Sequence, residues 1–194
     1  MKTALVIGSG ATVRQEYALA SQHEAGATII GVNWGGTVVE PDILFGNHAR
    51  ILVEKIAPDV EAHWERRRFA LHTTPLAFET DYAGEIGLNT WPMAYRKHVG
   101  SGVCAALAAK YMGFDRVVMI GCPHGGGYEP ERARYADCGG PDRDWGAHPR
   151  EAGRRNMDAG LVAVVPELKG FAVSTSGLTA ELLGRPEWLE RIEA

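Results

Sequence analysis

Two glycine bends that carry hydroxyl groups are the residues of this chain best suited to hold an anion. Residues 8–12 read GSGAT and residues 100–102 read GSG, and each bend directly precedes a segment of helical character. Backbone N–H groups at the start of a helix have no intrahelical partner, and with a nearby hydroxyl they can bind a phosphate. A tight turn with Ser101 as the helix cap would have the same sequence. The pattern indicates a phosphate site and leaves the purely structural interpretation open.

His148 is the residue that could transfer a proton. It lies near the end of residues 123–150, a stretch rich in Gly, Pro, Arg and Asp without apolar periodicity, and it precedes a helical segment. The ordinary pKa of histidine lies near neutral pH, so this side chain can act as a general base. It could equally be a helix-entry residue. A compact domain tolerates a long irregular loop mainly as a lid or binding segment, and this is the role we predict for residues 123–150.

Asn33 is the third candidate, because it follows the apolar run of residues 28–32. Its side-chain amide could offer both a donor and an acceptor to a ribose or a base edge. A turn residue before Gly35 and Gly36 is the alternative interpretation.

The elements that must position these residues alternate between strands and helices. Short apolar runs predict strands at residues 3–7, 28–32, 43–45, 69–72, 116–121 and 171–175. Helical segments are predicted at residues 14–25, 50–56, 61–68, 101–112, 151–164 and 178–192. The continuous apolar run 117–120 is typical of a parallel strand that is buried on both faces. The pattern predicts an α/β fold with one doubly wound, mainly parallel sheet and helices on both faces.

In such a fold the ligand lies at the carboxyl ends of the strands, where both bends and Asn33 would meet. The bend at residues 8–12 lacks the third glycine of the G-x-G-x-x-G fingerprint, which disfavours NAD as the ligand. Residues 73–99 show no clear pattern and are interpreted as a connecting region that forms part of a pocket wall.

Composition narrows the class of protein. With 194 residues and 45% hydrophobic content, the chain is most simply a single domain, residues 1–194. A net charge of −4 argues against nucleic-acid binding. No apolar run reaches the length of a membrane span, and the first residues read as a strand rather than a signal peptide, so we expect a cytoplasmic protein without a membrane span. The sequence leaves the oligomeric state open, including a homo-oligomer.

The ordered set of motifs resembles the bacterial sialyltransferases that use CMP-sialic acid, with their relatives among the 6-hydroxymethylpterin diphosphokinase-like (MptE-like) proteins. In that group a first strand enters a Gly-Asn-Gly-Pro-Ser turn, a second strand ends in Asn, and Ser-Gly-Val opens a helix followed by a strand that ends in Gly. The matching stretches here are residues 8–12, 32–33 and 101–121, and the last is the most specific. The resemblance spans roughly residues 3–165.

The resemblance implies roles for these positions. Ser9, Gly10 and Thr12 would hold the phosphate and ribose of a nucleotide, while Ser101 with Gly102 would contact its phosphate or base. A tyrosine of the lid would assist the phosphate, which points to Tyr128 or Tyr135, and His148 would be the general base. The full set of expected nucleotide-binding residues comprises the bends and strand exits: Gly8, Ser9, Gly10, Thr12, Asn33, Gly100, Ser101, Gly102, Gly121 and His124.

The expected function is a nucleotide-dependent transferase, most simply a glycosyltransferase that moves a sugar from a CMP-type donor to a hydroxyl acceptor. Catalysis would use Tyr128, His148 and backbone N–H groups at the leaving phosphate, and it would not require a metal. One alternative is MptE-like diphosphate transfer from ATP with Mg²⁺ held by Asp142 and Asp144, or by Asp137. Another is a nucleotide-binding protein without catalysis, because fold likeness does not fix chemistry.

Overall fold

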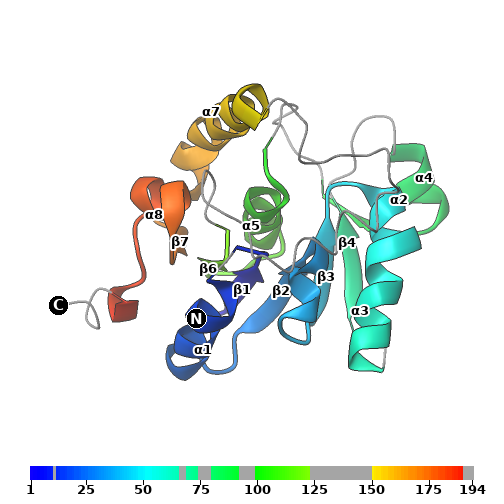
Figure 1. Cartoon of the computed structure of the whole chain (residues 1–194), viewed down its shortest axis with the longest axis horizontal. Helices are drawn as coiled ribbons and strands as arrows, with labels where there is room; N and C mark the ends of the chain where they lie inside the picture. The colour runs from blue at the N-terminus through cyan, green and yellow to red at the C-terminus, as the bar shows by residue number, and fades with distance from the viewer. Residues whose placement is uncertain (11, 66–68, 74–79, 92–98, 123–149, 190–194) are drawn as a thin grey trace.

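The computed structural model describes the whole chain except residues 11, 66–68, 74–79, 92–98, 123–149 and 190–194. The described residues form one sheet of seven strands in the order β5-β4-β3-β2-β1-β6-β7, and every neighbouring pair is parallel (Figure 1). The strands are β1 (Thr3–Ile7), β2 (Thr28–Val32), β3 (Ile43–Gly46), β4 (Ala70–Thr73), β5 (Asn89–Thr90), β6 (Arg116–Ile120) and β7 (Ala172–Ser174). The predicted α/β fold with a parallel sheet is confirmed.

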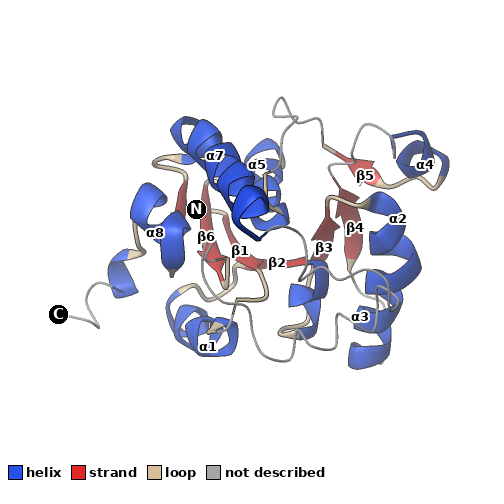
Figure 2. Ribbon diagram, turned by 45° about the horizontal axis from the view of Figure 1, so that its top comes forward, coloured by secondary structure: helices blue, strands red, loops and turns tan. Residues whose placement is uncertain are grey.

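Helical elements connect the strands and cover both faces of the sheet (Figure 2). They are α1 (Val13–His23), η1 (Asn33–Thr37), α2 (Ala49–Ile51), η2 (Leu52–Ile56), α3 (Ala57–Trp64), α4 (Thr80–Glu85), α5 (Ser101–Tyr111), α7 (Arg150–Leu168) and α8 (Gly177–Leu183). Figure 2 shows α1 and α3 on one side of the sheet and α5 and α7 on the other.

The side chains of β1 show how the two layers are divided. Ala4 and Val6 pack into the cluster that contains α5 and α7, whereas Leu5 and Ile7 pack into the cluster that contains α1. Successive residues of a strand point to opposite faces, so a fully apolar strand is what a sheet covered on both faces requires. The small residues of α5 are buried from Val103 to Ala109, which brings this helix close to the sheet.

Several element boundaries differ from the prediction. Residues 73–99 contain α4 and the edge strand β5, which has only two residues and therefore leaves little pattern in the sequence. The helix expected at residues 178–192 ends at Leu183 instead. Gly184 adopts a φ of 92° and Pro186 follows, a combination that stops a helix.

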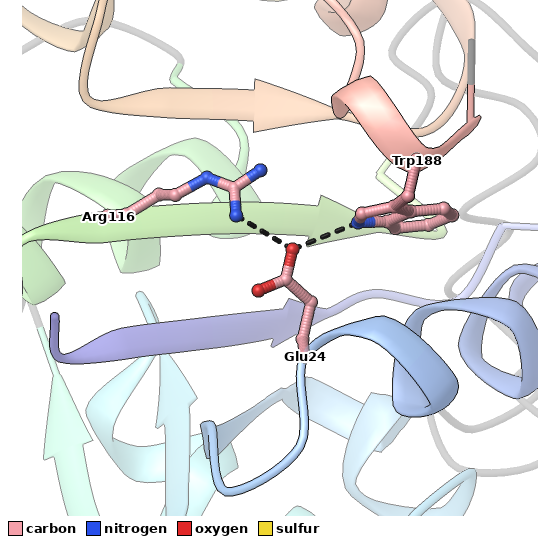
Figure 3. Close-up of polar contacts among 3 residues, drawn as sticks. All are labelled: Glu24, Arg116 and Trp188. Atoms are coloured by element: carbon pink, nitrogen blue, oxygen red, sulfur yellow. Dashed lines mark hydrogen bonds and ion pairs between the residues drawn. The ribbon is translucent and has the colours of Figure 1, made fainter. Parts of the chain in front are cut away.

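A buried carboxylate joins the end of α1, the start of β6 and Trp188. Glu24, which follows α1, accepts hydrogen bonds from the Arg116 guanidinium at 2.8 Å and from the Trp188 indole N–H at 2.9 Å (Figure 3). Trp188 also stacks on His23 with 5.2 Å between ring centroids. Glu24 follows α1 and Arg116 begins β6, at the opposite end of the strands from the candidate site described next, whereas Trp188 packs in the cluster that contains α1.

Candidate functional site

The order of strands changes direction at β1. This strand pairs with β2 on one side and with β6 on the other, while the chain runs from β1 through α1 to β2 and reaches β6 only after α5. Loops that leave two neighbouring strands in opposite directions open a crevice at their carboxyl ends. The exits of β1, at residues 8–10, and of β6, at Gly121, lie at this switch point.

The first bend is tied directly to the exit of β6. The Gly8 amide donates to the Ile120 carbonyl and the Gly10 amide donates to the Gly121 carbonyl, both at 2.8 Å. Gly121 has a φ of 61°, and a Cβ placed there would lie 2.6 Å from the Cβ of Val13. Only glycine allows this close approach. In this structure the Gly8 and Gly10 amides therefore donate within the protein, and a nucleotide contact at these residues stays a prediction.

The two glycine bends converge on one side chain, Cys122. A Cβ added to Gly8 would lie 2.7 Å from the Cys122 sulfur, and a Cβ added to Gly102 would also lie 2.7 Å from it. Residues 8–10 and 100–102 therefore share one neighbour although they are far apart in sequence. Burial and, to a smaller extent, the negative charge of Glu16 raise the pKa of the Cys122 thiol to about 12. The Cys122 side chain, which contacts both bends, is therefore a neutral thiol.

The second bend opens α5. Gly100 is the N-cap residue with an extended backbone, its carbonyl accepts the amides of Val103 and Cys104, and the first turn of α5 contains no acidic residue. Asn47, which follows β3, donates its side-chain amide to the Val99 carbonyl at 3.3 Å and to the Cys104 sulfur at 3.2 Å. Asn47 thus anchors the start of α5 to the exit of β3.

Asn33 lies at the exit of β2 in the left-handed conformation, with a φ of 52° that asparagine tolerates better than most residues. Its Oδ1 atom lies 2.9 Å from the position of a Cβ at Gly46, so the side chain is directed toward the exit of β3. The Trp64 indole of α3 donates to the Gly36 carbonyl at 2.8 Å and holds η1 in place. The half-buried Asn33 is therefore fixed at the same edge as the two bends.

Glu16 and Thr175 are residues of this edge that the sequence pattern did not reveal. One carboxylate oxygen of Glu16 accepts the Gly121 amide at 2.8 Å and the Thr175 hydroxyl, and the other accepts the Thr12 hydroxyl. Thr179 of α8 donates to the Cys122 carbonyl at 2.7 Å. These bonds join the exits of β1, β6 and β7, and only the tertiary structure brings their partners together.

His72 is a further titratable group on β4, near the carboxyl edge of the sheet. Its Nδ1 atom accepts the Trp91 indole N–H at 2.9 Å, and the two rings stack with centroids 5.8 Å apart. Burial lowers the pKa of His72, so the ring is held in its neutral form. No sequence motif marks this pair, because the two residues lie on a short strand and a connecting segment.

The remaining predicted residues lie outside the described part of the chain. These are His124, Tyr128, Tyr135, His148 and the carboxylates Asp137, Asp142 and Asp144. All of them belong to the predicted lid, of which the structure describes only Arg150. Among the described residues, no three His, Cys, Asp or Glu side chains are grouped as metal ligands. Within that part of the chain, no helix combines the length and apolar character needed to cross a bilayer.

The comparisons with known proteins show the fold. A structure of a CstII sialyltransferase variant in complex with CMP is similar with a TM-score of 0.63 at 11% identity, covering 97% of this chain and 88% of that one. CstII from Campylobacter jejuni with the substrate analogue CMP-3FNeuAc gives 0.63 at 10% identity over 97% and 88%. Monomeric CstII gives 0.61 at 10% identity over 95% and 86%.

No protein-family model matches the chain, and no curated protein matches it in sequence. At such low identity the structural likeness establishes the fold and not the activity. The chain therefore has the fold of the sialyltransferase CstII, with both glycine bends at the carboxyl edge of the central strands.

Proposed function

We propose that this protein is a glycosyltransferase that uses a nucleotide sugar of the CMP type. The observation that carries the proposal is the convergence of the two glycine bends on Cys122 at the switch point of the sheet. Ligands of doubly wound folds bind in that crevice. CstII structures of the same fold contain CMP or a CMP-sugar analogue.

In the proposed complex the nucleotide spans the two bends. The start of α5, at residues 100–102, offers N–H groups with the positive end of the helix dipole and is suited to the phosphate. Ser9 and Thr12 lie at the other bend, and Asn33 lies between the exits of β2 and β3 and offers an amide to the donor. His124 would add a contact from the segment that follows Cys122.

Transfer requires two further events in this proposal. His148 takes the proton of the acceptor hydroxyl as that oxygen attacks the anomeric carbon, and the bond from this carbon to the phosphate oxygen breaks. Tyr128 donates a hydrogen bond to the leaving phosphate, which stabilises its charge. Both residues belong to the segment that we expect to close over the donor and exclude water.

Ligand binding and turnover test the proposal separately. A thermal-shift screen with CMP, UDP, GDP and ATP, each with and without Mg²⁺, should show the largest rise in melting temperature with CMP, and Mg²⁺ should not be required. A preference for ATP with Mg²⁺ would contradict the proposal. With a CMP-sugar donor, His148→Ala should retain CMP binding while transfer falls by about 10²–10⁴-fold. Unchanged transfer would contradict the role of His148.

A further inference from the structure

Three backbone amides at the bend between β1 and α1 already donate hydrogen bonds within the protein. The Gly8 and Gly10 amides donate to β6-exit carbonyls, and the Val13 amide donates to the Gly10 carbonyl at 3.1 Å. A phosphate at a helix N-terminus is normally held by such amides. These three amides are used within the protein and are not offered to an anion.

The hydroxyl of Thr12 is a further donor that is used within the protein, because it donates to Glu16. The Thr12 hydroxyl donates to the Glu16 carboxylate, whose other oxygen accepts the Gly121 amide and the Thr175 hydroxyl. A hydroxyl has one proton but two lone pairs. While its proton points to Glu16, the exposed Thr12 oxygen can offer a ligand only an acceptor.

The charge of Glu16 acts in the same direction. The carboxylate lies in the first turn of α1, where it interacts favourably with the positive end of the helix dipole. A second anion at this helix start would be repelled. The first turn of α5 contains no acidic residue, so the two bends have opposite electrostatic character.

We propose that Glu16 determines the specificity of the first bend: it excludes phosphate and turns Thr12 into an acceptor for a neutral ribose hydroxyl. The nucleotide then lies with its ribose at the first bend and its phosphate at the start of α5. This inference rests on the proposed function, because it assigns an orientation to the CMP group of the donor. Glu16 is a positioning residue that acts through Thr12.

Two neutral ligands test the inference without a change of ligand charge. Cytidine carries the ribose hydroxyls and 2′,3′-dideoxycytidine lacks them, so the ratio of their affinities reports the hydroxyl contacts. Calorimetry on the full chain should give a ratio of about 10 in favour of cytidine, typical of a lost hydrogen bond. Glu16→Gln keeps the shape but directs an amide N–H at Thr12, which turns the Thr12 proton outward. A ribose hydroxyl can also accept that proton, so the ratio should stay near 10, but inorganic phosphate should compete with cytidine about 10-fold more strongly than in wild type.

Two further variants make the result decisive. Thr12→Val removes the acceptor oxygen, leaves two hydrogen bonds of Glu16 in place and should lower the ratio to about 2. Glu24→Gln changes a buried carboxylate near the amino ends of the strands and should keep the wild-type ratio. If wild type binds CMP but Thr12→Val keeps the wild-type ratio, or Glu16→Gln shows no stronger competition by phosphate, the inference on Glu16 is overturned alone. If wild type binds neither CMP nor cytidine, the proposed function fails and the inference fails with it.

Discussion

The contact of both glycine bends with Cys122 predicts the outcome of a double-mutant cycle. In Gly102→Ala the new methyl group would lie 2.7 Å from the Cys122 sulfur, whereas non-bonded heavy atoms prefer about 3.5–4.0 Å. One of the two groups must therefore move by roughly 1 Å, and overpacking of this kind costs about 1–3 kcal/mol of unfolding free energy. Cys122→Ala removes the sulfur and makes room for the methyl group.

The double variant Gly102→Ala/Cys122→Ala should therefore lose less unfolding free energy than the two single variants together, by about 1 kcal/mol or more. Urea unfolding followed by circular dichroism measures all four proteins. Gly8→Ala is the matched control. Its methyl group would meet both the sulfur and the Gly121 carbonyl oxygen, which is backbone and remains in Cys122→Ala. Cys122→Ala should thus rescue Gly102→Ala but not Gly8→Ala. Additive losses for Gly102→Ala and Cys122→Ala would refute the placement of the α5 bend against Cys122.

Three other properties follow from the buried groups. Burial lowers the pKa of His72 below 6.5, so His72 is protonated more readily in the unfolded chain than in the folded protein. The unfolding free energy should therefore fall as the pH drops below about 6.5. Urea titrations at pH 7.5 and 5.5 should show a smaller fall for His72→Gln than for wild type. With its pKa raised to about 12, the Cys122 thiol should resist iodoacetamide at pH 8 in the native protein and react in urea, as mass spectrometry of the modified peptide would show; rapid native labelling would contradict its burial. Glu24→Ala leaves the Arg116 guanidinium without its partner and should lower the unfolding free energy by about 2 kcal/mol in urea titrations. The affinity for CMP should stay unchanged, and a clear loss of CMP affinity would contradict the position of Glu24 away from the candidate site.

The sequence was sufficient for the central strands because their patterns are local. The continuous apolar run of β6 and the glycine bends after β1 and before α5 can each be recognised within a few residues. Strand β5 could not be predicted, since two residues carry no periodicity and this edge strand depends on pairing with β4.

The candidate site was predictable only in part for the same reason. Ser9, Asn33 and Ser101 follow or precede recognisable elements, so their place at one edge follows from the fold. Glu16 looked like an ordinary residue of an exposed helix, and its importance comes from partners at Gly121 and Thr175, more than a hundred residues away. Contacts between residues so far apart in the sequence cannot be recognised from a local sequence pattern.

The most direct test of the central claim is an NMR titration of the labelled protein with CMP. If one nucleotide spans the two bends, the amide signals of Ser9, Ser101 and Gly102 should shift together and give one common Kd. The amides around Glu24 and Arg116, at the opposite edge, should stay unchanged. Shifts confined to that opposite edge, or different Kd values for the two bends, would contradict a shared nucleotide site.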